Sequence, residues 1–94
     1  MGKLFDILTI CNKAGKLCFG FDATVKSVNE NKTHLILTAS DLSPKTLKEL
    51  EFKTQNKIRI INIDFDMDTI SCYLGKKTGI ISINDKGFAK AINR

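Results

Sequence analysis

The stretch from His34 to Phe52, HLILTASDLSPKTLKELEF, predicts a strand that is followed by a helix that begins near Ser43. Its first part, His34 to Ala39, is almost continuously apolar, which is typical of a strand buried on both faces. Ser43 can accept a hydrogen bond from the free N–H groups of a helical first turn, and Pro44 follows where its missing N–H is harmless. The apolar side chains of this helix that are expected to reach the core are Leu47, Leu50 and Phe52.

The alternation of strand and helix extends in both directions along the chain. Apolar residues at three- and four-residue spacing predict helices, and short apolar runs bounded by Gly, Asn or Asp predict strands. The further helices are expected at 3–14, 21–31, 67–74 and 85–92, and the further strands at 17–19, 59–63 and 79–83. The expected apolar face of the first helix consists of Leu4, Ile7, Leu8, Cys11 and Ala14. This order with short connections predicts a three-layer α/β/α sandwich around a largely parallel sheet.

Length and composition exclude several classes of protein. The 94 residues predict one domain over residues 1–94, since each of two halves would be too small for a core without disulfides or metal. No apolar run approaches the roughly 20 residues of a membrane span, and the first residues lack the features of a signal peptide. With 43% apolar residues the chain is expected to be a globular, cytoplasmic protein with no membrane partner.

The side chains that support catalysis or metal binding are few. Three cysteines, Cys11, Cys18 and Cys72, form no CxxC pair, and His34 is the single imidazole, so zinc is not expected. We expect three reduced, mostly buried thiols. The chain has no GxGxxG, GxxxxGK[ST] or GxSxG motif and no nucleophile–base pair, so neither an enzyme nor a cofactor is predicted.

The acidic run Asp64-Phe-Asp-Met-Asp68 has two possible interpretations. Alternate carboxylates can converge on a cation, but this run lacks the glycine and the late glutamate of a calcium-binding EF-hand loop. Asp66 and Asp68 stand where a helix is expected to begin, where carboxylates cap the helix and stabilise its dipole. Helix capping is therefore the favoured interpretation.

Basic residues exceed acidic residues by 15 to 10, which gives a formal net charge of +5. The excess lies near the two ends of the chain, and residues 76–94 hold five basic residues and one acidic residue. A positive surface attracts polyanions, nucleic acid first among them. Ordinary solvation accounts for this net charge equally well in a small domain.

The segment from Lys13 to Lys26, KAGKLCFGFDATVK, places a glycine before a helix whose first turn holds Asp22. The first N–H groups of such a helix point outward and attract anions. The loop Gly75–Gly79, with two lysines, is expected near this helix start in a sandwich of this order. A purely structural alternative is that Asp22 caps the helix and pairs with Lys26, a contribution of ~0.2–0.5 kcal/mol.

Three segments together resemble the L7Ae/L30e family of kink-turn RNA-binding ribosomal proteins, most closely its small bacterial branch. They are AGKL with the following Gly and Lys, HLILTASDLSPKT, and YLGKKTGIISINDKGFAKA, and the resemblance extends from about residue 3 to residue 92. It implies an α/β/α sandwich with a four-stranded mixed sheet. It also implies that the start of the second helix and the late loop grip RNA together.

The family motif at the start of the second helix is Gly-Ala-Asn-Glu-x-x-Lys. Gly20 and Lys26 match it, and Lys16 falls where the family has a lysine. Asp22 replaces the asparagine and Ala23 replaces the glutamate, the two residues that in the family meet the sheared G·A pairs of the kink-turn. The late loop reads Lys-Lys-Thr-Gly rather than the apolar-Ser-Arg-Pro pattern of archaeal members.

The resemblance implies a monomeric, non-enzymatic protein that binds structured, kink-turn-like RNA or the ribosome. The residues expected to contact RNA are Lys16, Gly20, Phe21, Asp22, Lys26, Lys76, Lys77 and Thr78. An alternative is a protein-interaction module on the same fold with a decayed RNA site, because an ionised Asp accepts but does not donate hydrogen bonds and Ala does neither.

Overall fold

The computed structural model describes residues 2–93 and alternates helix and strand throughout. The elements are α1 (Gly2–Lys13), β1 (Leu17–Phe19), α2 (Phe21–Asn29), β2 (Leu35–Thr38), α3 (Pro44–Lys53), β3 (Ile60–Asn62), α4 (Met67–Leu74), β4 (Ile80–Ile83) and α5 (Lys86–Ile92). Each helix and strand expected from the sequence is present, and each predicted end lies within two residues of the observed one.

Side-chain caps fix where three of the helices begin. Ser43 Oγ accepts from the N–H of Thr46 at 3.1 Å at the start of α3, with Pro44 in the first turn, as the sequence predicts. The carboxylates of Asp66 and Asp85 do the same for α4 and α5. Each cap satisfies an N–H group that has no partner within the helix.

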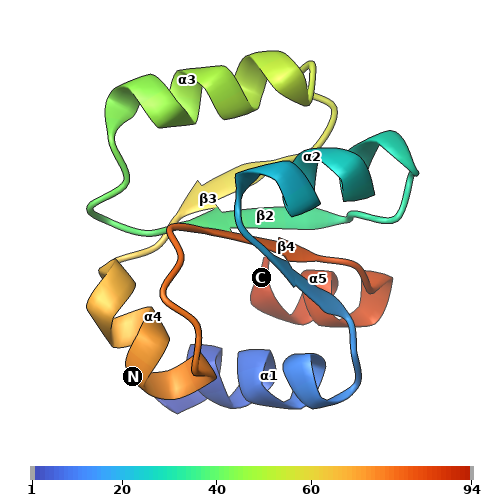
Figure 1. Cartoon of the computed structure of the whole chain (residues 1–94). Helices are drawn as coiled ribbons and strands as arrows, with labels where there is room; N and C mark the ends of the chain where they lie inside the picture. The colour runs from blue at the N-terminus through green and yellow to red at the C-terminus, as the bar shows by residue number, and fades with distance from the viewer. Residues whose placement is uncertain (1, 94) are drawn as a thin grey trace.

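The sheet is mixed, with the strand order β1-β4-β2-β3 (Figure 1). Only β2 and β3 pair in parallel, and β4 runs antiparallel to both of its neighbours. The expectation of a largely parallel sheet was therefore wrong, whereas the mixed sheet implied by the family resemblance is confirmed. The reason is that β4 enters between β1 and β2 beside the end of β2, where the N–H of Ala39 donates to the carbonyl of Gly79 at 2.9 Å.

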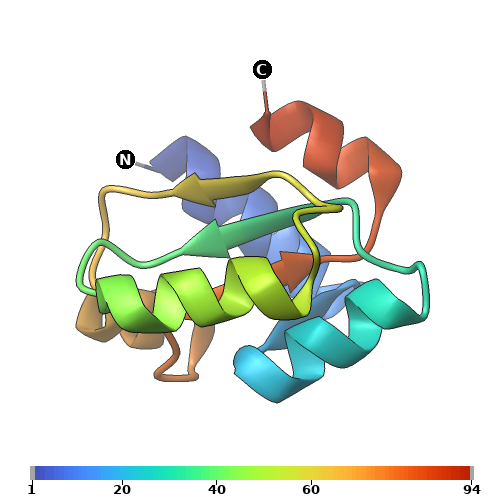
Figure 2. The same cartoon turned by 90° about the horizontal axis from the view of Figure 1, so that it is seen from above.

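Helices cover both faces of the sheet, which confirms the three-layer sandwich. Helices α2 and α3 lie on one face, and α1, α4 and α5 lie on the other (Figures 1 and 2). The central strands are buried on both sides, so alternate residues enter two separate cores. In β4, Ile81 and Ile83 join the core under α1, whereas Ile80 joins the core under α2 and α3.

Three side chains differ from the expected core. Phe52 is 79% exposed at the end of α3, while Leu50 alone in that helix is fully buried. Phe5, which the sequence analysis did not include, is 1% exposed in α1, whereas Ala14 lies on the surface. The rings of Phe65 and Tyr73 pack on Phe5, with centroids 4.8 and 4.3 Å away, and fix the side of α1 that faces α4.

The three cysteines are free thiols in different environments. Cys11 is fully buried in the larger core, Cys18 is half-buried and Cys72 is exposed, so the expectation of mostly buried thiols was wrong for Cys72. Burial, with a smaller contribution from the nearby carboxylate of Asp85, raises the pKa of Cys11 from 9.0 to about 11 against the opposing charge of Lys16.

We expect a thiol reagent at about pH 8 to modify Cys72 first and Cys11 only when the protein unfolds, because the thiolate is the reactive species. Mass-spectrometric mapping of timed modification measures this difference. Equal rates for Cys11 and Cys72 would contradict it.

The raised pKa of Cys11 also means that the unfolded chain loses the thiol proton first as the pH rises. The free energy of unfolding should therefore fall between pH 9 and about 11.

Among residues 2–93, no helix is both long enough and apolar enough to cross a membrane.

Candidate nucleic-acid interface

The start of α2 lies against the loop of residues 75–79 that joins α4 to β4. The carbonyl oxygen of Ile80 accepts one hydrogen bond from the N–H of Gly20 at 2.9 Å and another from Thr78 Oγ1 at 3.0 Å. One peptide group therefore holds both segments, and Figure 2 shows them next to each other along its lower edge. The two segments that were expected to be neighbours are adjacent.

Gly20 adopts a backbone conformation that only glycine takes readily, with φ +98° and ψ 168°. An L side chain is strained in this region even though space is open around the position of a Cβ atom. This conformation lets the N–H of Gly20 reach Ile80 while its carbonyl oxygen accepts from Thr24 at 3.1 Å in the first turn of α2. The match to the family glycine thus has a physical basis in the turn itself.

The structural alternative for Asp22 does not hold. Gly20 is the N-cap residue of α2, and no side chain accepts a hydrogen bond from the first turn. Within the described part of the chain, the ion pairs within 4.0 Å include none between Asp22 and Lys26. Asp22 and Lys26 are both exposed, so the uncapped start of α2 faces solvent.

The lysines of the late loop differ in their surroundings. Lys76 extends over the ring of Phe19, with its Nζ atom 5.7 Å from the ring centroid, which places its charge beside the end of β1. Lys77 pairs with Asp68 at 3.2 Å, and both side chains are exposed, so water weakens this contact. The side chain of Thr78 stabilises the loop itself, because its Oγ1 also accepts a hydrogen bond from the N–H of Ile80 at 3.2 Å.

Of the two remaining candidates, Phe21 is partly buried and packs on the core under α2, so its side chain anchors the helix start. Lys16 lies at the opposite end of β1 from Gly20. Lys16 is therefore not part of the surface at Ile80. It lines a second feature, which was not expected from the sequence.

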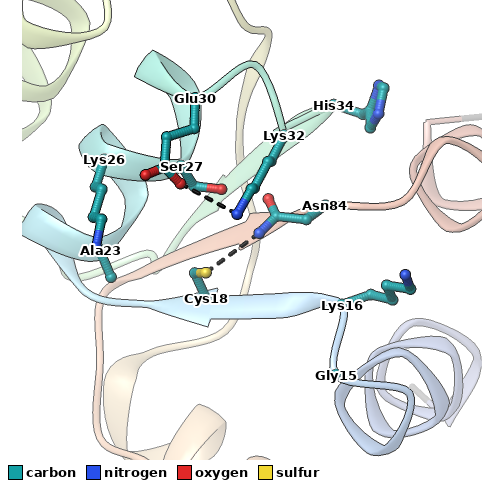
Figure 3. Close-up of a pocket in the computed structure, with 10 residues that line it drawn as sticks. All are labelled: Gly15, Lys16, Cys18, Ala23, Lys26, Ser27, Glu30, Lys32, His34 and Asn84. Atoms are coloured by element: carbon teal, nitrogen blue, oxygen red, sulfur yellow. Dashed lines mark hydrogen bonds and ion pairs between the residues drawn. The ribbon is translucent and has the colours of Figure 1, made fainter.

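That feature is a surface hollow of about 720 Å³ between α2, β1 and the start of β2 (Figure 3). Lys26 and Ala23 lie at one end of it and Lys16 at the other, and Lys32 lies between them. Sequence reasoning did not single out Lys32, which follows the expected end of the second helix at residue 31. His34, which was expected to open a strand, lies exposed beside the hollow.

Asn84 fixes the floor of the hollow by joining three strands. Its N–H donates to the carbonyl of Lys16 at 2.8 Å, its Oδ1 accepts from Thr33 Oγ1 at 3.0 Å, and its Nδ2 donates to Cys18 Sγ at 3.2 Å. The residues before β1 and β2 are therefore tied to the end of β4. These three hydrogen bonds fix the lining residues of the hollow relative to one another.

Three buried hydroxyl groups lie between α2 and β4 without a hydrogen-bond partner among the described residues. They belong to Thr24, Ser27 and Ser82, and Ser27 also lines the hollow. A buried hydroxyl with no partner costs free energy, so its presence calls for a bound water or another polar group.

The acidic run of residues 64–68 serves the helix that follows it. Asp66 caps α4 by accepting from the N–H of Thr69 at 2.8 Å, and this hydrogen bond lowers the pKa of Asp66. Asp68 pairs with Lys77. No group of three or more His, Cys, Asp or Glu side chains that could hold a metal ion occurs among residues 2–93. The capping interpretation of Asp66 is confirmed.

Comparison with known proteins gives a consistent result. Residues 3–93 match the model of the family described as "Ribosomal protein L7Ae/L30e/S12e/Gadd45 family". The RNA-binding protein YlxQ of Enterococcus faecium is 27% identical over 89 residues, which cover 94% of this chain and 85% of the relative. YlxQ of Bacillus subtilis is 25% identical over 93 residues, 94% of this chain and 89% of the relative.

A ribosomal protein and two solved structures extend the similarity. The large ribosomal subunit protein eL30 of Candida glabrata is 26% identical over 83 residues, 85% of this chain and 79% of the relative. A Bacillus halodurans protein of unknown function superposes with a TM-score of 0.87 at 23% identity over the whole of both chains. The 15.5 kD RNA binding protein of Giardia lamblia gives 0.76 at 17% identity, over 96% of this chain and 78% of that one.

Proposed function

Because the chain belongs to the L7Ae/L30e/S12e/Gadd45 family of ribosomal proteins, we propose that it binds structured, kink-turn-like RNA without catalysing a reaction. The start of α2 and the loop of residues 75–79 form the binding surface in this proposal. The single observation that carries it is the carbonyl of Ile80, which accepts hydrogen bonds from both segments and holds them as one surface.

The chemistry of this surface suits a sharply bent phosphate backbone. The first N–H groups of α2 have no side-chain cap, and such groups attract phosphate. Lys26, one turn further along α2, and Lys76, beside Phe19, supply positive charge on either side of them. Lys77 adds charge where phosphate displaces Asp68, and Lys16 adds charge at the far end of β1.

Asp22 is the side chain that would contact a base. An ionised carboxylate accepts hydrogen bonds but does not donate them, so Asp22 can receive the exocyclic amine of guanine or cytosine. Ala23, in the position of the family glutamate, makes no polar contact. We therefore expect a preference for the bent backbone that is stronger than the preference for any base.

A comparison of two RNAs tests the proposal. Binding to a kink-turn RNA should be tighter than binding to a straight duplex of equal length, because only the bent strand meets both segments at once. Both affinities should fall as salt rises, by ~0.7–0.9 log units per phosphate contact for each log unit of salt. Fluorescence anisotropy at two salt concentrations measures both effects.

Equal and weak affinity for the two RNAs would overturn recognition of bent RNA. It would favour the protein-interaction module, for which the replacement of the family asparagine and glutamate by Asp22 and Ala23 is the supporting observation. A pull-down after nuclease treatment would then recover a protein partner that does not depend on RNA.

A further inference from the structure

The hollow beside α2 shares Lys26 and Lys16 with the surface of the proposed function and extends from α2 along β1 to the residues before that strand. Three lysines and one glutamate line it, so its net charge is positive. In Figure 3, Lys26, Lys32 and Lys16 follow one another from the α2 end to the α1 end. Such a row of cations attracts negatively charged groups.

The hydrogen-bonding groups of the hollow are not saturated. Ser27 is 4% exposed and lines the hollow, and its hydroxyl has no partner among the described residues. The amide of Asn84 donates one hydrogen bond to the sulfur of Cys18, a weak acceptor, although the group carries two N–H donors. A ligand with several strong acceptor oxygens and negative charge would satisfy both the donors and the lysines.

We propose that this hollow binds a phosphate group, with Lys32 as the central contact. Lys32 lies between Lys26 and Lys16, and its Nζ atom pairs with Glu30 Oε1 at 3.3 Å on the exposed side of the hollow. Both side chains of this pair are exposed, so water weakens the contact, and Glu30 competes with the ligand for Lys32. The phosphate comes from one of two sources, the backbone of a bound RNA or a free phosphate or nucleotide. If it comes from RNA, the site rests on the proposed function.

The first arm of the test uses RNA. Lys32→Gln should weaken binding of the kink-turn RNA by about five- to eightfold at about 0.1 M salt and lower the salt slope by ~0.7–0.9, the loss of one phosphate contact. Glu30→Gln should tighten binding roughly fivefold, the effect of one unit charge about 4 Å away in water. The matched controls are Lys45→Gln and Glu49→Gln on α3, both exposed and outside the hollow, which should change neither value.

The second arm uses inorganic phosphate and AMP, titrated into the wild-type protein and into Lys32→Gln. If a free phosphate is the source, the amide resonances of Ser27, Lys32 and Asn84 should shift in the wild type and not in the variant. If the RNA backbone is the source, these resonances shift only with RNA, and the first arm gives the predicted changes.

The two proposals fail separately. Suppose that the wild-type protein binds the kink-turn RNA, that Lys32→Gln and Glu30→Gln leave its affinity and salt slope unchanged, and that no resonance responds to phosphate. This result overturns the phosphate site in the hollow and leaves the proposed function standing. A wild-type protein that binds no RNA overturns the proposed function, and the phosphate titration then decides the hollow on its own. Thermal unfolding of each variant shows that the fold is kept, as expected for exposed positions.

Discussion

Replacing Lys26 and Lys76 together by glutamine is expected to weaken binding of a kink-turn RNA by about 25- to 60-fold at about 0.1 M salt. The two lysines lie on the two segments that meet at the carbonyl of Ile80, so both would contact one bent strand. Each lost phosphate contact contributes ~0.7–0.9 to the salt slope, so the slope should fall by ~1.4–1.8 in the double variant. Glutamine keeps most of the side-chain length and removes only the charge.

The matched control is Lys45→Gln with Lys48→Gln, which removes the same net charge from exposed positions of α3. Binding titrations across a range of salt concentrations separate a local contact from general attraction. If the α3 pair weakens binding as much as the Lys26 and Lys76 pair, the surface at Ile80 is not the RNA site. A straight duplex should lose less affinity than the kink-turn RNA in the Lys26 and Lys76 variant.

Replacing Phe5 by alanine is expected to lower the free energy of unfolding by about 3–5 kcal/mol. Phe5 is 1% exposed, stacks on Tyr73 with centroids 4.3 Å apart and meets Phe65 edge to face. Its removal would leave a void between α1 and α4 that neighbouring rings fill only partly. A chain of this length has a stability of roughly 5–14 kcal/mol, so the loss would be a large fraction of it.

The control for this substitution is Ile10→Ala in the same helix. Ile10 is 58% exposed, so its truncation should change the free energy of unfolding by less than about 0.5 kcal/mol. Urea unfolding followed by circular dichroism measures both variants, and the slope with denaturant should stay unchanged. Similar losses for the two variants would show that α1 does not pack through Phe5.

Much of the fold was predictable because local signals and tertiary structure agree. Ser43 and Pro44 begin α3 where the sequence places them, and the run from Leu35 to Thr38 is buried on both faces. The direction of β4 was not predictable, because short connections between helices and strands are compatible with either direction. The alternation of elements misled here because β4 enters the sheet between two strands that come earlier in the chain.

Half of the candidate site followed from sequence reasoning. Gly20 and the late loop carry local signals, a backbone turn and paired lysines, and they meet in three dimensions. Lys32 carries no such signal, since a lysine after a helix end is ordinary. Asn84 lines the hollow and joins residues near the ends of three strands, and its hydrogen bonds over 51 and 66 residues along the chain leave no trace in a local pattern. Phe52 is exposed because only part of α3 faces the core, whereas the spacing of its apolar residues predicted that Phe52 would be buried.

The arrangement of the helices has a practical consequence for anyone who immobilises or labels this protein. In Figure 2 the beginning of α1 and the end of α5 lie along the upper edge, and α2 with the loop after α4 lies along the lower edge. A dye, a biotin or a surface tether attached through either of those two helix ends would lie on the opposite side from the proposed RNA-binding surface. Sensor and single-molecule experiments can therefore anchor the molecule there without blocking the face that they are meant to observe.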